Sequence, residues 1–222
     1  MAFSQHLLDN NREIRSLIAR HPFVLGIANG TLRVEKFRFY MRQDYVFLVE
    51  YCRIWGLAVA KADNLLTMGK LAQLLHSTLE VEMALHRAYA AEFGISESEL
   101  ESTSAAPTTH AYTRHLLNVA WSGSLAEIVG SLLPCQWGYL ELASEMAAEG
   151  KATPNNPYRK WIEAYSSPEY CDLARWLRDL FDSLTEGARP EELTKIEKEY
   201  AASSRYELMF WDMSWREESW IA

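Results

Sequence analysis

Residues 125–149 read LAEIVGSLLPCQWGYLELASEMAAE, and this stretch decides the class of fold. Its apolar residues recur every three to four positions, which is the repeat of an α-helix. Gly150 follows directly and is a typical helix stop. The stretch therefore predicts a long, strongly apolar helix and indicates an all-α protein.

The same helical repeat runs through most of the chain, whereas strand-like alternation is scarce. Ser4 is expected to cap the first helix, and Gly26 and Asn29-Gly30 to break the chain after it. The expected helices cover about residues 4–20, 34–62, 67–93, 108–120, 125–149, 158–165, 168–186 and 190–216, with a short helix and a loop over 95–107. Because no repeat or long linker divides them, we expect one all-α helical-bundle domain over residues 1–222.

The composition is that of a globular protein with a sizeable core, since 49% of the 222 residues are hydrophobic and 23% are charged. The net charge of −8 argues against a nucleic-acid partner, because phosphates need clustered Lys and Arg. No stretch approaches the roughly 20 apolar residues that cross a bilayer, and the first residues lack the pattern of a secretory leader. The three cysteines are widely spaced and suit a reducing compartment, so we expect a cytoplasmic protein without a membrane partner.

Cys135 is the first residue that suggests chemistry. It stands in the motif LPCQWGY over residues 133–139, and Tyr139 lies one helical turn later on the same face. Gly138 is expected to let another element approach closely. Spacing alone favours a packing role for Cys135, because buried cysteines behave as small hydrophobes.

Two carboxylates lie on apolar, aromatic faces of expected helices. Asp44 shares its face with Phe47, and Glu207 shares its face with Phe210 and Trp211. An acid in such surroundings is costly unless it is paired, or is placed there for use. A salt bridge to a neighbouring helix explains Asp44 as well as a functional role does, and partial exposure near the chain end explains Glu207.

The histidines offer a weak metal signal. Glu82 and His86 lie one turn apart, as do His76 and Glu80, and such pairs can ligate metal ions. However, the paired Glu-x-x-His motifs of di-iron bundles are absent, and no histidine follows His115. Solvated or hydrogen-bonded histidines are therefore expected, with no metal and no organic cofactor.

Taken together, six stretches resemble the TenA family of thiaminases II, whose fold is like that of haem oxygenase. They follow the family's order across nearly the whole chain. They are RQDY (42–45), YCRIWGLAVAKA (51–62), PTTHAYT (107–113), LPCQWGY (133–139), PYRKWIEAY (157–165) and RYELMFWD (205–212). The resemblance implies an enzyme of thiamin salvage that hydrolyses aminopyrimidine products of thiamin breakdown.

The resemblance also implies a role for each of these side chains. Cys135 becomes the nucleophile, Asp44 contacts the amino and ring nitrogens of the pyrimidine, and Glu207 handles the proton of the leaving group. The remaining pocket residues orient or stack on the ring, and they are Tyr112, Tyr139, Tyr165 and Phe210. Judged alone, the tyrosines fit ordinary core packing with a hydrogen-bonded hydroxyl.

Phe47 is a departure from the family pattern, which usually has a tyrosine three residues after the active-site aspartate. The change removes a hydroxyl from the expected pocket and leaves room for a different pyrimidine. Two rival functions stay open, namely a non-catalytic pyrimidine-binding or regulatory protein and a di-metal oxygenase on the same architecture. The resemblance implies a homotetramer, and the eight tryptophans and seven methionines suit a subunit interface.

Overall fold

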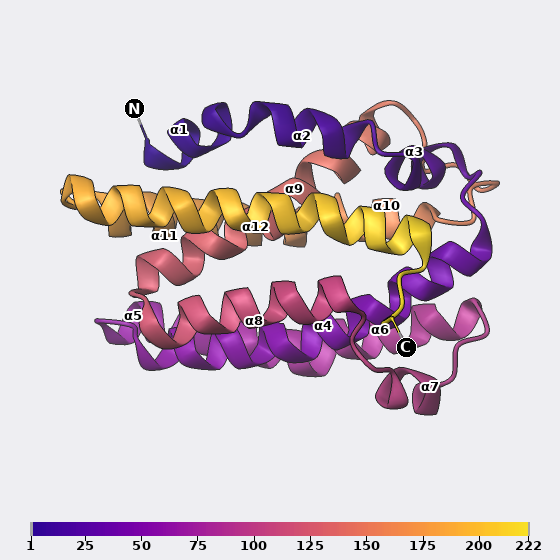
Figure 1. The fold of residues 1–222 in the computed structure, drawn as a ribbon, viewed down its shortest axis with the longest axis horizontal. Coiled ribbons are helices and arrows are strands. Elements are labelled where there is room, and N and C mark those ends of the chain that lie inside the picture. The colour runs from indigo at the N-terminus through magenta and orange to yellow at the C-terminus, as the bar shows by residue number, and fades with distance from the viewer. Residues whose placement is uncertain (1, 222) are drawn as a thin grey trace. The chain divides into compact units, whose positions relative to one another are not determined.

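The computed structural model describes residues 2–221, and Figure 1 traces the chain through them. Every regular element in this part of the chain is helical, as the apolar repeat predicts. The chain divides into two compact units. Unit 1 contains residues 2–33 and 129–212, and unit 2 contains residues 34–128 and 213–221. The two long helices α9 and α12 each contribute residues to both units, and a single domain stays a prediction.

Unit 1 is built from seven helical segments, of which α1 packs on α11, α2 on α3, and α10 on α11 (Figure 1). Their bounds are α1 (Phe3–Asn10), α2 (Arg12–Ala19), α3 (Pro22–Asn29), α9 (Leu125–Ala148), α10 (Arg159–Tyr165), α11 (Pro168–Thr185) and α12 (Pro190–Arg216). Helix α9 approaches its neighbours very closely at Gly130. A Cβ there would stand 2.8 Å from Phe181 and 3.0 Å from Ile196.

The first expected helix, over residues 4–20, is wrong as one element. It is interrupted at Asn11, whose side-chain amide donates to the Leu7 carbonyl oxygen at 2.9 Å and so completes the end of α1. Ser4 is not the cap that the sequence predicts. It lies inside α1, and its hydroxyl donates to Asp182 of α11 at 2.7 Å, so it joins two helices instead.

The expected break at Gly26 is also wrong. Helix α3 runs through Gly26 and ends at Gly30, which has a φ of +67°. The His21 ring nitrogen accepts from the Phe23 amide and begins the helix there. Gly26 is needed because a Cβ at that position would lie 2.9 Å from the Leu32 side chain. The glycine therefore serves a close contact and not a chain break.

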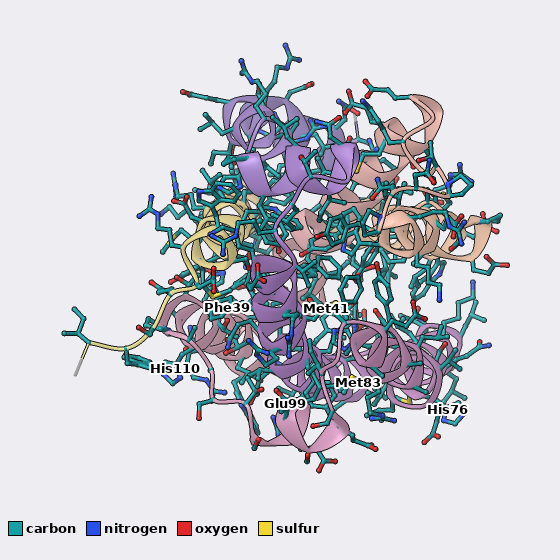
Figure 2. All side chains as sticks on the ribbon, turned by 90° about the vertical axis from the view of Figure 1, so that its right-hand side faces the viewer. Phe39, Met41, His76, Met83, Glu99 and His110 are labelled. Carbon is teal, nitrogen blue, oxygen red and sulfur yellow. The ribbon has the colours of Figure 1, made fainter. Side chains whose placement is uncertain are left out.

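Unit 2 centres on α4, which packs against α5, α6 and α8. The bounds are α4 (Val34–Ala60), α5 (Leu65–Ser77), η1 (Thr78–Glu82), α6 (Met83–Glu92), α7 (Glu97–Ser102) and α8 (Pro107–Ser122). Met41 of α4 and Met83 of α6 are buried in this core, whereas Glu99 of α7 lies at the surface (Figure 2). None of the helices over residues 2–221 is both long and apolar enough to span a membrane.

The expected helix over residues 67–93 contains an irregularity that its sequence pattern does not reveal. Residues 78–82 form one π-helical turn, η1, between α5 and α6. The preceding break at Asp63-Asn64 is confirmed, and the Asn64 side chain caps α5 by accepting from the Thr67 amide at 2.9 Å. A π turn inserts an extra residue and is frequent at functional sites. Here it ends at Glu82 and leads into α6, which carries His86.

Candidate active site

Asp44 lies on α4 in unit 2, and its side chain is buried. The Nε2 atom of His86, on α6, lies 3.1 Å from the Asp44 carboxylate. A neighbouring helix thus supplies the partner that a buried acid needs. The preceding residue, Gln43, fixes this part of α4 because it donates to the Ser104 carbonyl at 3.1 Å and accepts from the Ala106 amide at 2.8 Å.

A second carboxylate, Glu82, belongs to the same polar cluster. Burial, followed by the negative charge of Asp44, raises the pKa of Glu82 to about 7. The Thr78 side chain and His86 act in the opposite direction. Burial and the charge of Glu82 also raise the pKa of Cys52 to about 11, which keeps that thiol protonated near neutral pH. Unit 2 therefore holds one carboxylate, Glu82, that ionises less readily than usual because it is buried and lies near the negative charge of Asp44.

Aromatic rings of α4 and α8 form a wall in the same unit. Phe47 contacts Tyr112 with ring centroids 5.2 Å apart, and it stacks on Tyr51 at 6.1 Å. Tyr51 in turn meets Trp55 edge-on at 5.4 Å. Phe47 lies one turn after Asp44 on α4, and its ring contact brings Tyr112 of α8 beside it. The ring at position 47 is buried, so a hydroxyl there would need a partner inside the protein.

Cys135 lies on α9 in unit 1 and is partly exposed. It follows Pro134, through which the helix continues. Tyr139, one turn further along, is buried and meets Tyr165 edge-on at 4.9 Å. It also stacks on Trp211 of α12 at 5.3 Å. The predicted thiol therefore has a group of aromatic side chains one helical turn away.

Glu207 and Phe210 are both buried on α12, one turn apart. The buried position of Glu207 removes the partial exposure that its place near the chain end suggested. Trp211, which contacts Tyr139, follows one turn after Glu207. Of the predicted residues, unit 1 thus holds Cys135, Tyr139, Tyr165, Glu207 and Phe210, and unit 2 holds Asp44, Phe47 and Tyr112.

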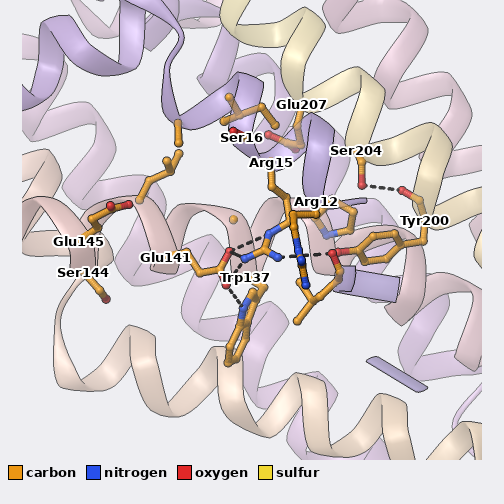
Figure 3. Close-up of a pocket in the computed structure, with 16 residues that line it drawn as sticks. Arg12, Arg15, Ser16, Trp137, Glu141, Ser144, Glu145, Tyr200, Ser204 and Glu207 are labelled. Carbon is orange, nitrogen blue, oxygen red and sulfur yellow. Dashed lines mark hydrogen bonds and ion pairs between the residues drawn. The ribbon is translucent and has the colours of Figure 1, made fainter. Parts of the chain in front are cut away.

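Glu207 also lines a cavity of about 640 Å³ within unit 1 (Figure 3). The cavity lies among α2, α9 and α12, and the lining includes Ser16, Trp137, Ser204 and Glu145. The side chains of Cys135 and Tyr139 are not part of this lining, although Pro134 and Gly138 of the same helix are. Gly138 does not support a close helix approach, because nothing described lies within 4 Å of the Cβ that it lacks.

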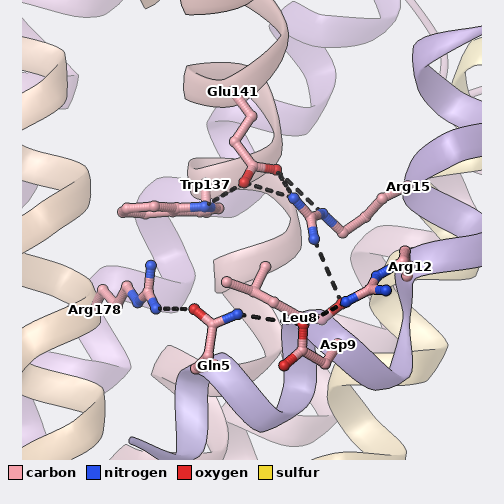
Figure 4. Close-up of polar contacts among 8 residues, drawn as sticks. All are labelled: Gln5, Leu8, Asp9, Arg12, Arg15, Trp137, Glu141 and Arg178. Atoms are coloured by element: carbon pink, nitrogen blue, oxygen red, sulfur yellow. Dashed lines mark hydrogen bonds and ion pairs between the residues drawn. The ribbon is translucent and has the colours of Figure 1, made fainter.

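A polar network that includes Arg15, Trp137 and Glu141 of the cavity lining is drawn in Figure 4. The Arg15 guanidinium donates to both Glu141 oxygens at 2.6 Å, and the Trp137 indole donates to Glu141 at 2.9 Å. The Arg178 guanidinium stands 4.6 Å over the Trp137 ring. Burial raises the pKa of the nearby Tyr200 to about 12, so its hydroxyl stays protonated. The sequence alone does not identify these residues. The only signal for them in the sequence is the four-residue spacing of Trp137 and Glu141, which places the two on one helical face.

The metal signal in the sequence is not supported by geometry. Among residues 2–221, no three His, Cys, Asp or Glu side chains are grouped so that they could hold a metal ion. The Glu82–His86 pair belongs instead to the hydrogen-bonded cluster around Asp44. The expectation that this histidine is hydrogen-bonded is confirmed.

Comparison with known proteins gives a consistent result. The chain matches the model of the TENA/THI-4/PQQC family over residues 8–217. It is 41% identical to the aminopyrimidine aminohydrolase of Halalkalibacterium halodurans over 99% of this chain and 98% of that protein. It is 35% identical to the aminopyrimidine aminohydrolase of Helicobacter pylori over 97% of this chain and 100% of that protein.

Solved structures agree with the predicted class of fold. The TenA homologue from P. horikoshii OT3 superposes with a TM-score of 0.90 at 30% identity, over 97% of this chain and 99% of that chain. A Shewanella denitrificans domain with a heme oxygenase-like fold superposes with a TM-score of 0.74 over 98% of this chain and 93% of its own. At 14% identity the second likeness concerns the fold alone. The all-α, haem-oxygenase-like prediction is confirmed.

Proposed function

Because the chain belongs to the TENA/THI-4/PQQC family, we propose that it is an aminopyrimidine aminohydrolase of thiamin salvage, a thiaminase II. It converts aminomethyl-aminopyrimidine and water into hydroxymethyl-aminopyrimidine and ammonia. The observation that carries the proposal lies in unit 1. A partly exposed thiol stands one helical turn from a contacting set of aromatic rings, and a buried carboxylate lies one turn from the same set.

Cys135 acts as the nucleophile. Its thiolate adds to the ring carbon next to the one that bears the aminomethyl group, so that a C–S bond forms and a ring electron pair moves to a nitrogen. Asp44 holds the proton at that nitrogen. Addition removes the aromaticity that otherwise resists loss of the amine, and covalent catalysis of this kind divides one hard step into two easier ones.

Glu207 carries the proton for the leaving group. The amine departs with the bonding electron pair and the proton from Glu207, which leaves an exocyclic methylene on the ring. Water then adds to the methylene and returns a proton to Glu207. The ring expels the thiolate and becomes aromatic again. A carboxylic acid suits this work because a positioned side chain can give a proton to the leaving group and take one back from water.

Aromatic residues bind the flat faces of the pyrimidine. Phe210 stacks on the ring, and Tyr112, Tyr139 and Tyr165 orient it. Flat heterocycles are commonly held in this way, with aromatic side chains on the faces and few polar groups at the edge.

Product analysis tests the proposal. The protein is incubated separately with aminomethyl-aminopyrimidine and with thiamin, and the products are followed by mass spectrometry. Hydroxymethyl-aminopyrimidine is expected from the first substrate, and its absence from both incubations contradicts the proposal. Binding of the pyrimidine without turnover would favour the rival binding protein, for which Phe47 is the observation in favour.

The state of assembly and the cellular location belong to the same proposal. We propose a cytoplasmic homotetramer, since the family resemblance implies four subunits. Light scattering after size-exclusion chromatography measures the molar mass, and a monomer at micromolar concentration would contradict the tetramer.

A further inference from the structure

We infer that His86 and Glu82 are positioning residues for the proposed reaction, and that together they set the orientation and the proton supply of Asp44 at the pyrimidine edge. The inference rests on the proposed function. It concerns three side chains of unit 2 that come from α4, η1 and α6.

His86 fixes the Asp44 carboxylate in one orientation. Its Nε2 lies 3.1 Å from Oδ2 of Asp44, and the two side chains are only 7% and 9% exposed. An ionised carboxylate only accepts hydrogen bonds, so the His86 N–H donates here. One carboxylate oxygen is thereby engaged, and in the inferred complex Oδ1 meets the ligand.

The other ring nitrogen shows which form of His86 this arrangement suits. Nδ1 is buried and has no hydrogen-bond partner among residues 2–221. A protonated imidazole would bury an N–H donor without an acceptor, which is costly, whereas the neutral ring leaves only a weak acceptor there. The neutral ring therefore orients Asp44 without cancelling its negative charge.

Glu82 is placed to share a proton with Asp44. It ends the π turn η1 and lies one turn before His86. The charge of Asp44 adds to burial in favouring the protonated form of Glu82, whose pKa is about 7. The other groups that act on this cluster are the Thr78 hydroxyl, the Cys52 thiol and, through Cys52, Arg53. Below about pH 7 Glu82 therefore holds a proton beside the Asp44 carboxylate.

A neutral aminopyrimidine edge presents an N–H donor beside a ring nitrogen acceptor. Pairing that edge with a carboxylate requires one additional proton, held between Asp44 and the ring nitrogen. When this proton is present, Asp44 no longer repels a charge on Glu82, and Glu82 releases its proton more easily. Below pH 7 Glu82 therefore supplies the proton from within the cluster. Above pH 7 the proton comes from solvent, and affinity falls about tenfold for each pH unit.

Proton uptake on binding provides the test. Hydroxymethyl-aminopyrimidine, the proposed product, is titrated calorimetrically into the whole protein at pH 6.5 in buffers of different ionisation enthalpy. The wild type is expected to take up about a quarter of a proton, because Glu82 is about three-quarters protonated at this pH, and Glu82→Gln about one. Glu80→Gln, an exposed carboxylate on the same π turn, is the matched control and behaves as wild type. Equal uptake by wild type and Glu82→Gln overturns the inference.

His86 variants test the orienting role separately. His86→Leu is expected to weaken binding about tenfold or more at every pH, whereas His86→Gln restores most of the affinity because its amide can donate to Asp44. Equal losses in the two variants, with both folded by circular dichroism, contradict the positioning role. Product binding with the expected proton linkage but without turnover sinks the proposed function and leaves this inference standing. Turnover without the proton linkage overturns this inference and leaves the proposed function standing. Loss of both product binding and turnover in the wild-type protein overturns both claims.

Discussion

The two units hold acids of the same chemical kind in different surroundings. In unit 2, Asp44 lies in a closed polar cluster with an imidazole and a second carboxylate. In unit 1, Glu207 lines an open cavity and lies one turn from an aromatic group that includes Trp211. The comparison indicates that the surroundings of a carboxylate determine which role it can take. A carboxylate held by hydrogen bonds suits recognition, and a buried acid beside accessible space suits proton transfer with solvent or a leaving group.

Removal of the proposed nucleophile in unit 1 is expected to have the largest effect, because every turnover of the proposed reaction passes through its thiolate. Cys135→Ser should lower kcat by roughly 10⁴-fold or more while the protein stays folded. Cys171→Ser is the matched control, since Cys171 is also a partly exposed cysteine and lies on α11 of the same unit. Steady-state hydrolysis and circular dichroism measure the two effects. Near-normal turnover by Cys135→Ser would remove the thiol from the mechanism.

Glu207→Gln should act on turnover and not on binding. We expect kcat to fall about 10²- to 10³-fold, as is typical when a general acid is lost, with product affinity changed less than about threefold. The exposed Glu145, which lines the same cavity, provides the control Glu145→Gln. A large loss of affinity in Glu207→Gln would make this residue a ligand contact, and the contrast with Asp44 would disappear.

Asp44→Asn should weaken product binding more than it lowers turnover. Loss of a charged hydrogen-bond partner is worth about 1.5–3 kcal/mol, so we expect the dissociation constant of the product to rise roughly 10- to 150-fold. Asp63→Asn, an exposed residue just after α4, is the control. Calorimetry measures binding, and hydrolysis at saturating substrate measures kcat. An unchanged dissociation constant would place recognition elsewhere.

The enclosed cluster should also make stability depend on pH. The pKa of Glu82 is about 7 in the folded chain against an ordinary value of 4.5, so the folded state binds protons more tightly than the unfolded state. Its contribution is complete below about pH 4.5 and is lost as the pH rises to 7. Between pH 5.5 and 7.5 we expect a loss of about 2 kcal/mol in unfolding free energy. Urea unfolding should show a flatter profile for Glu82→Gln than for Glu80→Gln, and identical profiles would refute the assignment.

Phe47→Tyr should have the smallest effect. The ring is buried against Tyr112 and Tyr51, so an added hydroxyl changes the site only where it finds a partner. We expect KM to change about two- to tenfold, the range of one neutral hydrogen bond, with little change in kcat. A large change in kcat would show that position 47 affects the chemical step and not only substrate recognition.

Much of the fold follows from the sequence because long apolar repeats specify long helices. The expected helices over 34–62, 125–149 and 190–216 differ from α4, α9 and α12 by two residues or fewer at each end. The failures are local. Asn11 bonds to the Leu7 carbonyl four residues earlier, and Gly26 lies against the Leu32 side chain, and an apolar repeat reports neither contact. The sequence pattern does not predict the π turn, because one inserted residue leaves the apolar repeat almost unchanged.

The sequence singles out residues of the candidate site by their type, but it does not reveal which side chains contact them. The spacing of Glu82 and His86 predicts a shared face, but their partner Asp44 is about 40 residues away in the chain. The cavity beside Glu207 was not foreseen, because helices distant in the chain create it. Periodicity reports which face of a helix is buried, whereas the identity of the group that covers that face is a property of the whole fold.

Gly138 gives the chain an adjustable position. It lines the cavity, and a methyl group there would meet no described atom within 4 Å, whereas the same change at Gly130 would collide with Phe181 and Ile196. Two glycines on one helix therefore differ in the room around them: an added Cβ at position 130 forces neighbouring side chains to shift, whereas at position 138 it meets none. Successive replacement of Gly138 by Ala, Val and Leu would narrow the cavity stepwise and offers protein engineers a graded size filter on the helix that carries Cys135.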